Sequence, residues 1–413
     1  MLKILLCLLY QRHNNNAHKD FAMVSSSFMD LTSTEKVYIG ERAASAIVQE
    51  ADRMGAQRVF LMVSKSLRDN TDEIALIQQA LGSRVVAIYD GMPPHAPRSA
   101  VLDAASMARE ARADLVVTVG GGSITDAGKL VTICLKHNIL THDDFDAFRM
   151  YVNDDGEVVK PEFDGPDIRA VICPTTLSGG EFNPLSGATD ETLKLKQGFE
   201  QRMMAPVTVV LDPALTVHTP EWLWLSTGVR AVDHALEALG SLASNYFADG
   251  MAASALELLS DGLPRVKADP GDLDARLKCQ VGAWQSMVPI VGGVPMGLSH
   301  AIGHVLGGSF DVPHGYCSCV MAPAVLAFNE PVNGARQRRI SRAFGRPEEK
   351  ASVIADEFIA ALGMPRSLAA VGVSGADHQL VAENTMHDFW ARTNPRVIAN
   401  AEDVLPVLAM AAG

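Results

Sequence analysis

The chain has 413 residues, which is enough for two or three domains. Hydrophobic residues make up 48% and charged residues 20% of it, with 33 Gly and 21 Pro, a globular composition that excludes collagen-like, coiled-coil and disordered proteins. The 48 Asp and Glu outnumber the 35 Lys and Arg, and the formal charge of −13 argues against nucleic acid as a general partner.

Residues 1–35 precede the globular pattern. The apolar run at residues 2–10 is interrupted by Lys3 and is far shorter than the roughly 20 residues of a membrane helix, so no membrane span is predicted. The polar stretch QRHNNNAHKD that follows lacks a clear signal-peptide cleavage site. We expect a disordered or artefactual extension here. Met23 and Met29 leave open whether residues 1–28 belong to the native protein.

The number and spacing of the cysteines indicate the cellular compartment of the protein. Six cysteines without the spacing of a disulfide framework indicate reduced thiols and a cytoplasmic protein. Cys317 and Cys319 form a C-x-C pair, but without a second pair they are not assigned as a metal site.

Residues 36–212 alternate short apolar runs with amphipathic segments. Strands are expected at residues 58–63, 84–89, 115–119, 170–173 and 207–211, and helices at residues 42–54, 72–81, 98–112 and 125–137. The strands are continuous Val/Ile/Leu runs, which is typical of parallel strands covered on both faces. This pattern predicts an α/β domain with a doubly wound, Rossmann-like parallel sheet.

After Asp212 the pattern changes to Ala- and Leu-rich helical segments. Helices are expected at residues 227–243, 250–259, 274–286, 299–307, 351–362 and 379–390. The sequence therefore predicts a second, all-α domain over residues 213–413.

A glycine-rich turn follows the strand at residues 115–119. Gly120, Gly121, Gly122 and Ser123 lie directly before a helix, where a bare backbone and free N–H groups favour phosphate binding. The turn is not a G-x-G-x-x-G motif, so a tight turn that merely needs glycine is the alternative. Asp126 either caps this helix or supports the loop.

A second polar loop follows the strand at residues 170–173. It contains Thr175, Thr176 and Ser178, and open α/β sheets hold their ligands at the carboxyl ends of strands. Taken alone, this signal is weak.

Four histidines indicate a shared site in the helical domain. His300 and His304 are spaced i, i+4 on one helix, so both imidazoles can face one ligand. His314 follows in a Pro-His-Gly turn, and a separate helix carries His234.

These motifs, in this order, resemble those of the iron-containing (type III) alcohol dehydrogenase superfamily. The resemblance covers about residues 36–410 and rests on GGGSITDAGK (120–129), PTTLSGGE (174–181), VVLDP (209–213), TGVRAVDHALEAL (227–239) and the histidine segment 297–315. Within the superfamily the chain looks most like the maleylacetate reductases, through HAP (95–97), HVLGGSFDVPH (304–314) and NPR (394–396).

The resemblance implies a homodimeric oxidoreductase that uses NADH or NADPH, with its active site between the two domains. The glycine turn then takes the pyrophosphate, and Thr175, Thr176 and Ser178 lie near the nicotinamide. Lys194 looks like the family's cofactor-side lysine. Ser64 stands where NAD-selective relatives carry Asp, so weak discrimination between NADH and NADPH is expected.

The departure from the family concerns the metal. His234, His300 and His314 match three ligand positions and His304 a nearby non-ligand histidine, but Arg230 stands at the position of the usual Asp ligand. An arginine aimed into the site opposes a divalent cation such as Fe or Zn. Asp233 is one helix residue from His234, about 100° of rotation, so it is expected to point elsewhere and pair with Arg230.

The first hypothesis is an NAD(P)H-dependent reductase of a small acidic carbonyl substrate. This is the maleylacetate reductase type, which reduces an unsaturated oxo-dicarboxylate in aromatic degradation. Alternatives are a metal-dependent alcohol dehydrogenase and a non-catalytic dinucleotide-binding relative. A cyclising synthase is less favoured, because no additional Lys and Arg cluster is present to bind a phosphorylated sugar acid.

Overall fold

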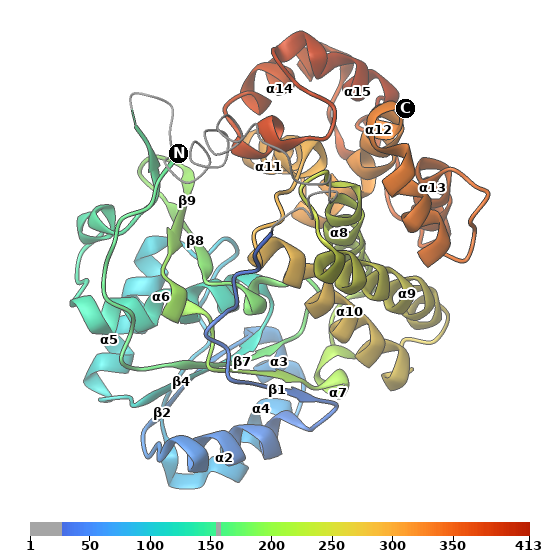
Figure 1. Cartoon of the computed structure of the whole chain (residues 1–413). Helices are drawn as coiled ribbons and strands as arrows, with labels where there is room; N and C mark the ends of the chain where they lie inside the picture. Colours follow the sequence, from blue (N-terminus) through green and yellow to red (C-terminus); the bar gives the residue numbers. More distant parts are fainter. Residues whose placement is uncertain (1–26, 154–157) are drawn as a thin grey trace, which may run out of the picture.

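The computed structural model describes residues 27–153 and 158–413. Figure 1 shows an α/β domain, coloured blue to green, beside a helical domain, coloured yellow to red. The expectations for residues 1–26 lie outside the described residues. The predicted fold class is confirmed.

The centre of the first domain is a six-stranded parallel sheet with the order β1-β10-β7-β4-β2-β3. Its strands are β1 (Lys36–Ile39), β2 (Val59–Val63), β3 (Val85–Tyr89), β4 (Leu115–Gly120), β7 (Ala170–Pro174) and β10 (Thr208–Leu211). The inner strands β2, β4, β7 and β10 are buried along their whole length, which explains their unbroken apolar sequences.

Helices cover both faces of this sheet. On one face α2 (Ala43–Met54) and α4 (Glu73–Leu81) pack through Ile47 and Ile77. On the other face α5 (Arg98–Glu110) and α6 (Gly122–His137) pack through Val101 and Leu130. Every element expected in this domain is present within a few residues of its predicted bounds.

Several elements of this domain were not predicted from the sequence. The edge strand β1 has only four residues, and α3 (Lys65–Asn70) has six. Two hairpins were also missed: β5 (Tyr151–Val152) with β6 (Val158–Val159), and β8 (Leu185–Asp190) with β9 (Leu195–Glu200). The second hairpin projects from the sheet domain, and it buries one face through Ala188 and Phe199.

Several helices of the second domain are longer than predicted. Its helices are α7 (Pro213–Thr216), α8 (Glu221–Gly240), α9 (Tyr246–Ala268), α10 (Leu273–Val291), α11 (Leu298–Phe310), α12 (His314–Ala343), α13 (Ala351–Ala361), α14 (His378–Thr385) and α15 (Leu405–Met410). The sequence did not predict α12, because it contains Pro323 and Pro331 and its helical backbone is interrupted at Asn333.

Short 3-10 segments connect these elements. They are η1 (Gly82–Arg84), η2 (Asp143–Ala147), η3 (Gly180–Phe182), η4 (Arg202–Met204), η5 (Ala369–Val371), η6 (Gly375–Asp377), η7 (Phe389–Thr393) and η8 (Ala401–Asp403). The residues expected to form a helix at 379–390 therefore divide between α14 and the start of η7.

The described end of the predicted extension is tied to both domains, which corrects the expectation of disorder for this part. The backbone N–H of Asp30 donates to the carbonyl of Gly292 at 3.3 Å, and that of Glu35 donates to Val207 at 2.9 Å. Residues 27–35 therefore run from the helical domain to the sheet.

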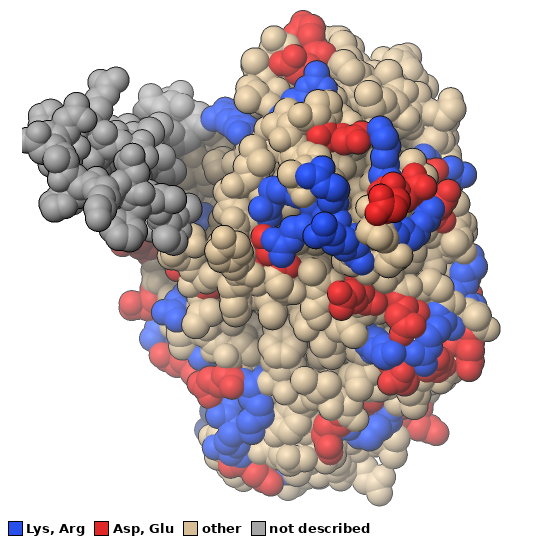
Figure 2. All heavy atoms as spheres, turned by 45° about the vertical axis from the view of Figure 1, so that its right-hand side comes forward, with Lys and Arg blue, Asp and Glu red and all other residues tan. Residues whose placement is uncertain are grey.

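The surface carries charges of both signs. On the face drawn in Figure 2, a group of Lys and Arg side chains near the centre is bordered by Asp and Glu, and no continuous basic stripe crosses it. Every described helix falls short of the combined length and apolar character that crossing a bilayer demands. The five described cysteines are buried and unpaired.

Candidate active site

The two polar loops predicted from the sequence meet at the carboxyl edge of the sheet, where β4 and β7 are neighbours. A Cβ atom on Gly121 would lie 3.2 Å from Cγ2 of Thr176, and one on Gly122 would lie 3.3 Å from Oγ of Ser178. Larger side chains at these two glycines would fill the space between the loops. The glycines therefore leave a narrow cradle lined by backbone and hydroxyl groups.

The cradle lies at the amino end of α6. Gly121 is the residue before the first helical turn, so N–H groups of this turn point outward and form a positive dipole end. The hydroxyl of Ser123 accepts a hydrogen bond from the backbone N–H of His95 at 3.0 Å. His95 and Ala96 have φ angles of 64° and 47°, a left-handed backbone that keeps this segment beside the helix end.

The second loop is also bonded to the helical domain. The hydroxyl of Thr219 donates to the carbonyl of Thr175 at 2.7 Å, and that of Thr227, on α8, accepts from the N–H of Leu177 at 3.1 Å. These contacts fix the cradle relative to α8, the helix that carries His234.

Asp126 supports the loop region rather than capping α6. Its carboxylate faces the β8–β9 hairpin, where Lys196 Nζ lies 3.5 Å from Oδ2. The side chain of Lys196 crosses Gly187, where an added Cβ would come within 2.2 Å of the lysine Cε. Lys194, the lysine singled out from the sequence, lies exposed at the hairpin tip. Lys196 is thus the hairpin lysine that reaches α6, and sequence reasoning missed it.

Ser64 lies at the carboxyl end of β2, directly before α3. Its backbone N–H donates to the carbonyl of Val119, and its hydroxyl lies 2.8 Å from that of Ser66. Lys65 is exposed and forms an ion pair with Asp69 at 3.0 Å. Residue 64 thus places a hydroxyl group, and not a carboxylate, at this strand end.

Three helices bring the four histidines together in pairs. His234 on α8 and His300 on α11 are buried, and their rings stack with centroids 4.9 Å apart. His304 on α11 and His314, the first residue of α12, are exposed and stack at 5.9 Å with an angle of 5°. Gly315 allows this arrangement, because an added Cβ would come within 2.6 Å of the Ser226 backbone on α8.

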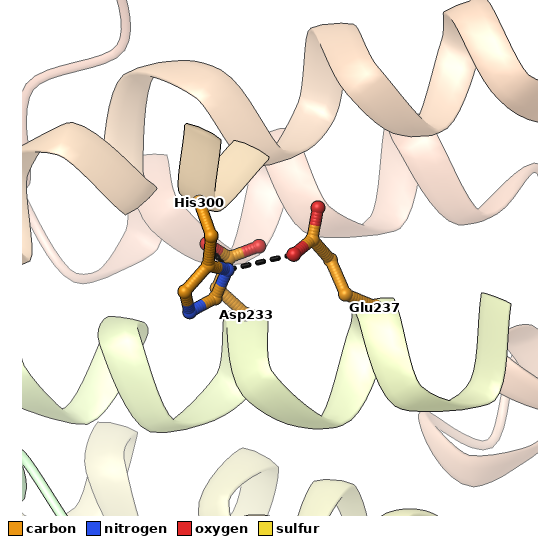
Figure 3. Close-up of side chains that lie close together, drawn as sticks. All are labelled: Asp233, Glu237 and His300. Carbon is orange, nitrogen blue, oxygen red and sulfur yellow. Dashed lines mark hydrogen bonds and ion pairs between the residues drawn. The ribbon is translucent and has the colours of Figure 1, made fainter. Parts of the chain in front are cut away.

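Behind the histidines lie two acidic residues that the sequence did not assign to the site. In Figure 3, Asp233 and Glu237 extend from α8 toward His300. Glu237 Oε2 lies 2.7 Å from His300 Nδ1 and also accepts the N–H of Gly297. Their i, i+4 spacing on the helix that carries His234 is the signal that could have found this pair.

Arg230 points into the same buried cluster. Its Nη1 donates to the hydroxyl of Ser318 at 3.2 Å, and this hydroxyl donates to Asp233 Oδ2 at 2.7 Å. The expected direct ion pair between Arg230 and Asp233 is absent from the described contacts, which corrects that prediction. Asp233 does turn away from His234 on its own helix, but this rotation directs it toward α11, where Oδ2 lies 3.6 Å from His300 Nδ1.

Burial and the charge of Arg230 favour the neutral form of His234, His300 and His314 by lowering their pKa. Burial lowers the pKa of His234 and of His300, and Arg230 lowers both further. The pKa of His314 is lowered first by Arg230, and Lys196 of the other domain contributes to the same effect. Burial raises the pKa of Asp233 and of Glu237. The cluster thus combines one guanidinium with three rings whose neutral form is favoured.

Two buried ring nitrogens in this cluster have no partner among the described residues. They are Nδ1 of His234 and Nε2 of His300. Buried polar atoms in folded proteins are nearly always satisfied, so such a pair indicates a position for a polar ligand atom.

Comparison with known proteins assigns the family. The model of "Iron-containing alcohol dehydrogenase" matches residues 34–213, and that of "Fe-containing alcohol dehydrogenase family, C-terminal" matches residues 224–412. The chain belongs to the iron-containing alcohol dehydrogenase family. The recognition made from the sequence is confirmed.

Individual relatives of the family agree over nearly the whole chain. The chain is 32% identical to Dehydrogenase FUM7 of Gibberella moniliformis, covering 89% of this chain and 93% of that one. It is 31% identical to Maleylacetate reductase 2 of Cupriavidus pinatubonensis, covering 90% and 93%. The crystal structure of maleylacetate reductase from Rhizobium sp. strain MTP-10005 aligns with a TM-score of 0.78 and 27% identity, covering 94% and 99%.

The family's iron does not fit the residues at the position that the resemblance implies. Among the described residues, the one group of three whose potential ligand atoms lie within 4.8 Å of one another is Asp233, Glu237 and His300, so His234, His300 and His314 do not converge in this way. The buried guanidinium of Arg230 stands at the place of the acidic ligand, and it disfavours a cation. The guanidinium instead suits an anionic or carbonyl oxygen.

Proposed function

We propose that this member of the iron-containing alcohol dehydrogenase family is an NAD(P)H-dependent reductase of a small acidic carbonyl compound. The substrate we favour is an unsaturated oxo-dicarboxylate, as in maleylacetate reductases. The observation that carries this proposal is the buried Arg230, held among neutral imidazoles at the position of the acidic metal ligand.

The cradle supports binding of a dinucleotide. Gly120, Gly121, Gly122 and Ser123 offer backbone N–H groups and the positive end of α6 to a pyrophosphate. Thr175, Thr176 and Ser178 line the opposite wall, and Lys196 rather than Lys194 is the hairpin lysine that reaches α6. A reduced nicotinamide bound there supplies the hydride.

The histidine cluster supplies electrostatic stabilisation for the reaction. When a hydride is added to the substrate carbon, an electron pair moves to the substrate oxygen, and a proton must follow. Arg230 can bind either a substrate carboxylate or this oxygen with its planar donor fork.

The comparisons alone do not select the substrate, since Dehydrogenase FUM7 and Maleylacetate reductase 2 are about equally similar to this chain. The charge of the site supports an acidic substrate. A metal-dependent alcohol dehydrogenase needs a cation site, which Arg230 opposes, whereas an acidic substrate gains a partner.

The test is the absorbance of NADH at 340 nm with a panel of oxo-dicarboxylates, oxo-monocarboxylates, aldehydes and simple alcohols. We expect turnover with dicarboxylates. Turnover restricted to simple alcohols or aldehydes and dependent on added metal would overturn the proposal. The homodimer, the cytoplasmic location and a role in aromatic degradation remain predictions.

A further inference from the structure

A carboxylate from the C-terminal part of the chain contacts His304, one of the two exposed histidines of the site. Oδ2 of Asp388 lies 2.8 Å from Nδ1 of His304. Asp388 precedes η7, while His304 is on α11, so the contact joins segments 84 residues apart. A carboxylate can only accept a hydrogen bond, so Nδ1 carries the ring hydrogen in a neutral His304.

The other ring nitrogen of His304 is free of such a contact among the described residues. Nε2 of His304 has no hydrogen-bond partner among the described residues, and 41% of the side chain is exposed. The ring lies parallel to that of His314, which feels the charges of both Arg230 and Lys196. His304 thus presents one free nitrogen beside the cluster that the proposed function uses.

The second oxygen of Asp388 has a separate structural role. Oδ1 accepts the backbone N–H of Trp390 at 2.8 Å and caps η7. This contact fixes the carboxylate from behind, so that its other oxygen can orient only His304. The arrangement is that of a carboxylate that sets the tautomer and the orientation of a catalytic imidazole.

We propose that Asp388 is a positioning residue that holds His304 with its hydrogen on Nδ1, so that Nε2 exchanges a proton with the substrate. The proposal rests on the proposed function. Hydride addition leaves the electron pair on the substrate oxygen, and the proton on Nε2 of a protonated His304 moves to the substrate. The N–H bond at Nε2 breaks, while the N–H bond at Nδ1 stays directed at Asp388.

Asp388→Asn is the sharpest variant, because the amide oxygen can still cap η7 while its NH₂ group turns to His304. An NH₂ group donates, so the ring hydrogen must move to Nε2. We expect kcat with an oxo-dicarboxylate to fall roughly 100-fold, within the usual range for a proton donor, with KM changed by less than about threefold. Asp388→Glu should recover part of the loss.

A double-mutant comparison separates positioning from folding. In a His304→Gln background, Asp388→Asn should cause no further loss, because Asp388 acts through His304. Asp377→Asn is the matched control, since Asp377 caps another short helix of the same region through Ser374. An Asp388→Asn effect below threefold, or an equal effect in both backgrounds, would overturn the proposal.

A second measurement does not depend on turnover. Long-range ¹H–¹⁵N spectra of ¹⁵N-histidine-labelled protein report the tautomer, with His304 assigned by its absence in His304→Gln. We expect Nδ1–H in the wild type and Nε2–H in Asp388→Asn. A neutral wild-type His304 with Nε2–H would overturn the proposal, whatever the activity. A wild type that reduces no oxo acid but shows Nδ1–H would refute the proposed function and leave the positioning by Asp388 supported.

Discussion

The guanidinium of Arg230 and the carboxylate of Asp233 are joined through one hydroxyl group, that of Ser318 on α12. Arg230 donates to this oxygen at 3.2 Å, and the hydroxyl donates to Asp233 at 2.7 Å. Because the serine stands between them, Asp233 stabilises the arginine without occupying its donor fork. Arg230 therefore keeps N–H groups for a substrate.

Arg230→Ala should raise KM for an oxo-dicarboxylate far more than KM for NADH. A lost hydrogen bond between charged groups costs about 1.5–3 kcal/mol, which corresponds to about 10- to 150-fold in affinity. Steady-state kinetics with each substrate varied in turn measure both constants. Ser318→Ala removes the hydroxyl but keeps the charge, so it should have the smaller effect. Equal rises in both KM values would mean that Arg230 supports the fold alone.

The purified enzyme should be active without stoichiometric iron or zinc. Elemental analysis and activity after treatment with a chelator test this directly, and activity lost to the chelator and restored by metal would contradict it. Arg230→Asp returns an acidic ligand to the cluster and removes the opposing charge. We expect this variant, incubated with Zn²⁺ or Fe²⁺, to retain more metal than the wild type.

The sequence predicted most of the sheet domain, because each inner strand is a continuous apolar run between amphipathic helices. It missed β1 and α3, which are too short to show a period, and the β8–β9 hairpin, whose polar face hides the strands. The kinked helix α12 was missed for a different reason. Its prolines break the pattern, and non-helical backbone at Asn333 divides it into two helical parts.

The motifs in the sequence indicated the site residues, but not their partners. The glycine turn, the threonine loop and the histidines have recognisable spacings, and the structure brings each set together. Glu237 has only its i, i+4 spacing from Asp233 as a signal, and Asp388 has none. Their contacts to His300 and His304 span 63 and 84 residues. Long-range partners of this kind depend on helix packing, which one sequence does not reveal.

Cofactor selectivity should be weak. Ser64 lies at the carboxyl end of β2, where an acidic residue would repel the 2′-phosphate of NADPH, and Lys65 is adjacent. Ser64→Asp should lower kcat/KM for NADPH by at least about tenfold and leave NADH nearly unchanged. A wild-type preference for NADH above about a hundredfold, or roughly 2.7 kcal/mol, would contradict the assignment.

Substitution of a histidine from either stacked pair, buried or exposed, should reduce turnover. His300→Ala removes the ring between Glu237 and the cluster, and His314→Ala removes the ring stacked on His304. We expect each to lower kcat/KM by more than threefold. A change within about threefold, less than about 1 kcal/mol, would show that the ring lies outside the reacting region.

The second loop contains a buried acid that should make stability depend on pH. Glu181 is 3% exposed, and burial raises its pKa from 4.5 to about 7, although the nearby Lys129 opposes this. Between these two values the folded state binds more protons than the unfolded state. The free energy of unfolding should therefore fall as pH rises from about 4.5 to about 7, by at most on the order of 3 kcal/mol.

Glu181→Gln removes this contribution, because the amide does not ionise. The urea midpoint of the variant should be close to that of the wild type at pH 5 and higher at pH 8. Glu348→Gln, at an exposed glutamate, is the control and should change neither midpoint. If the variant were destabilised equally at both pH values, the prediction would be wrong. The carboxyl group would then be needed for its contacts, and its ionisation at pH 8 would not lower the free energy of unfolding.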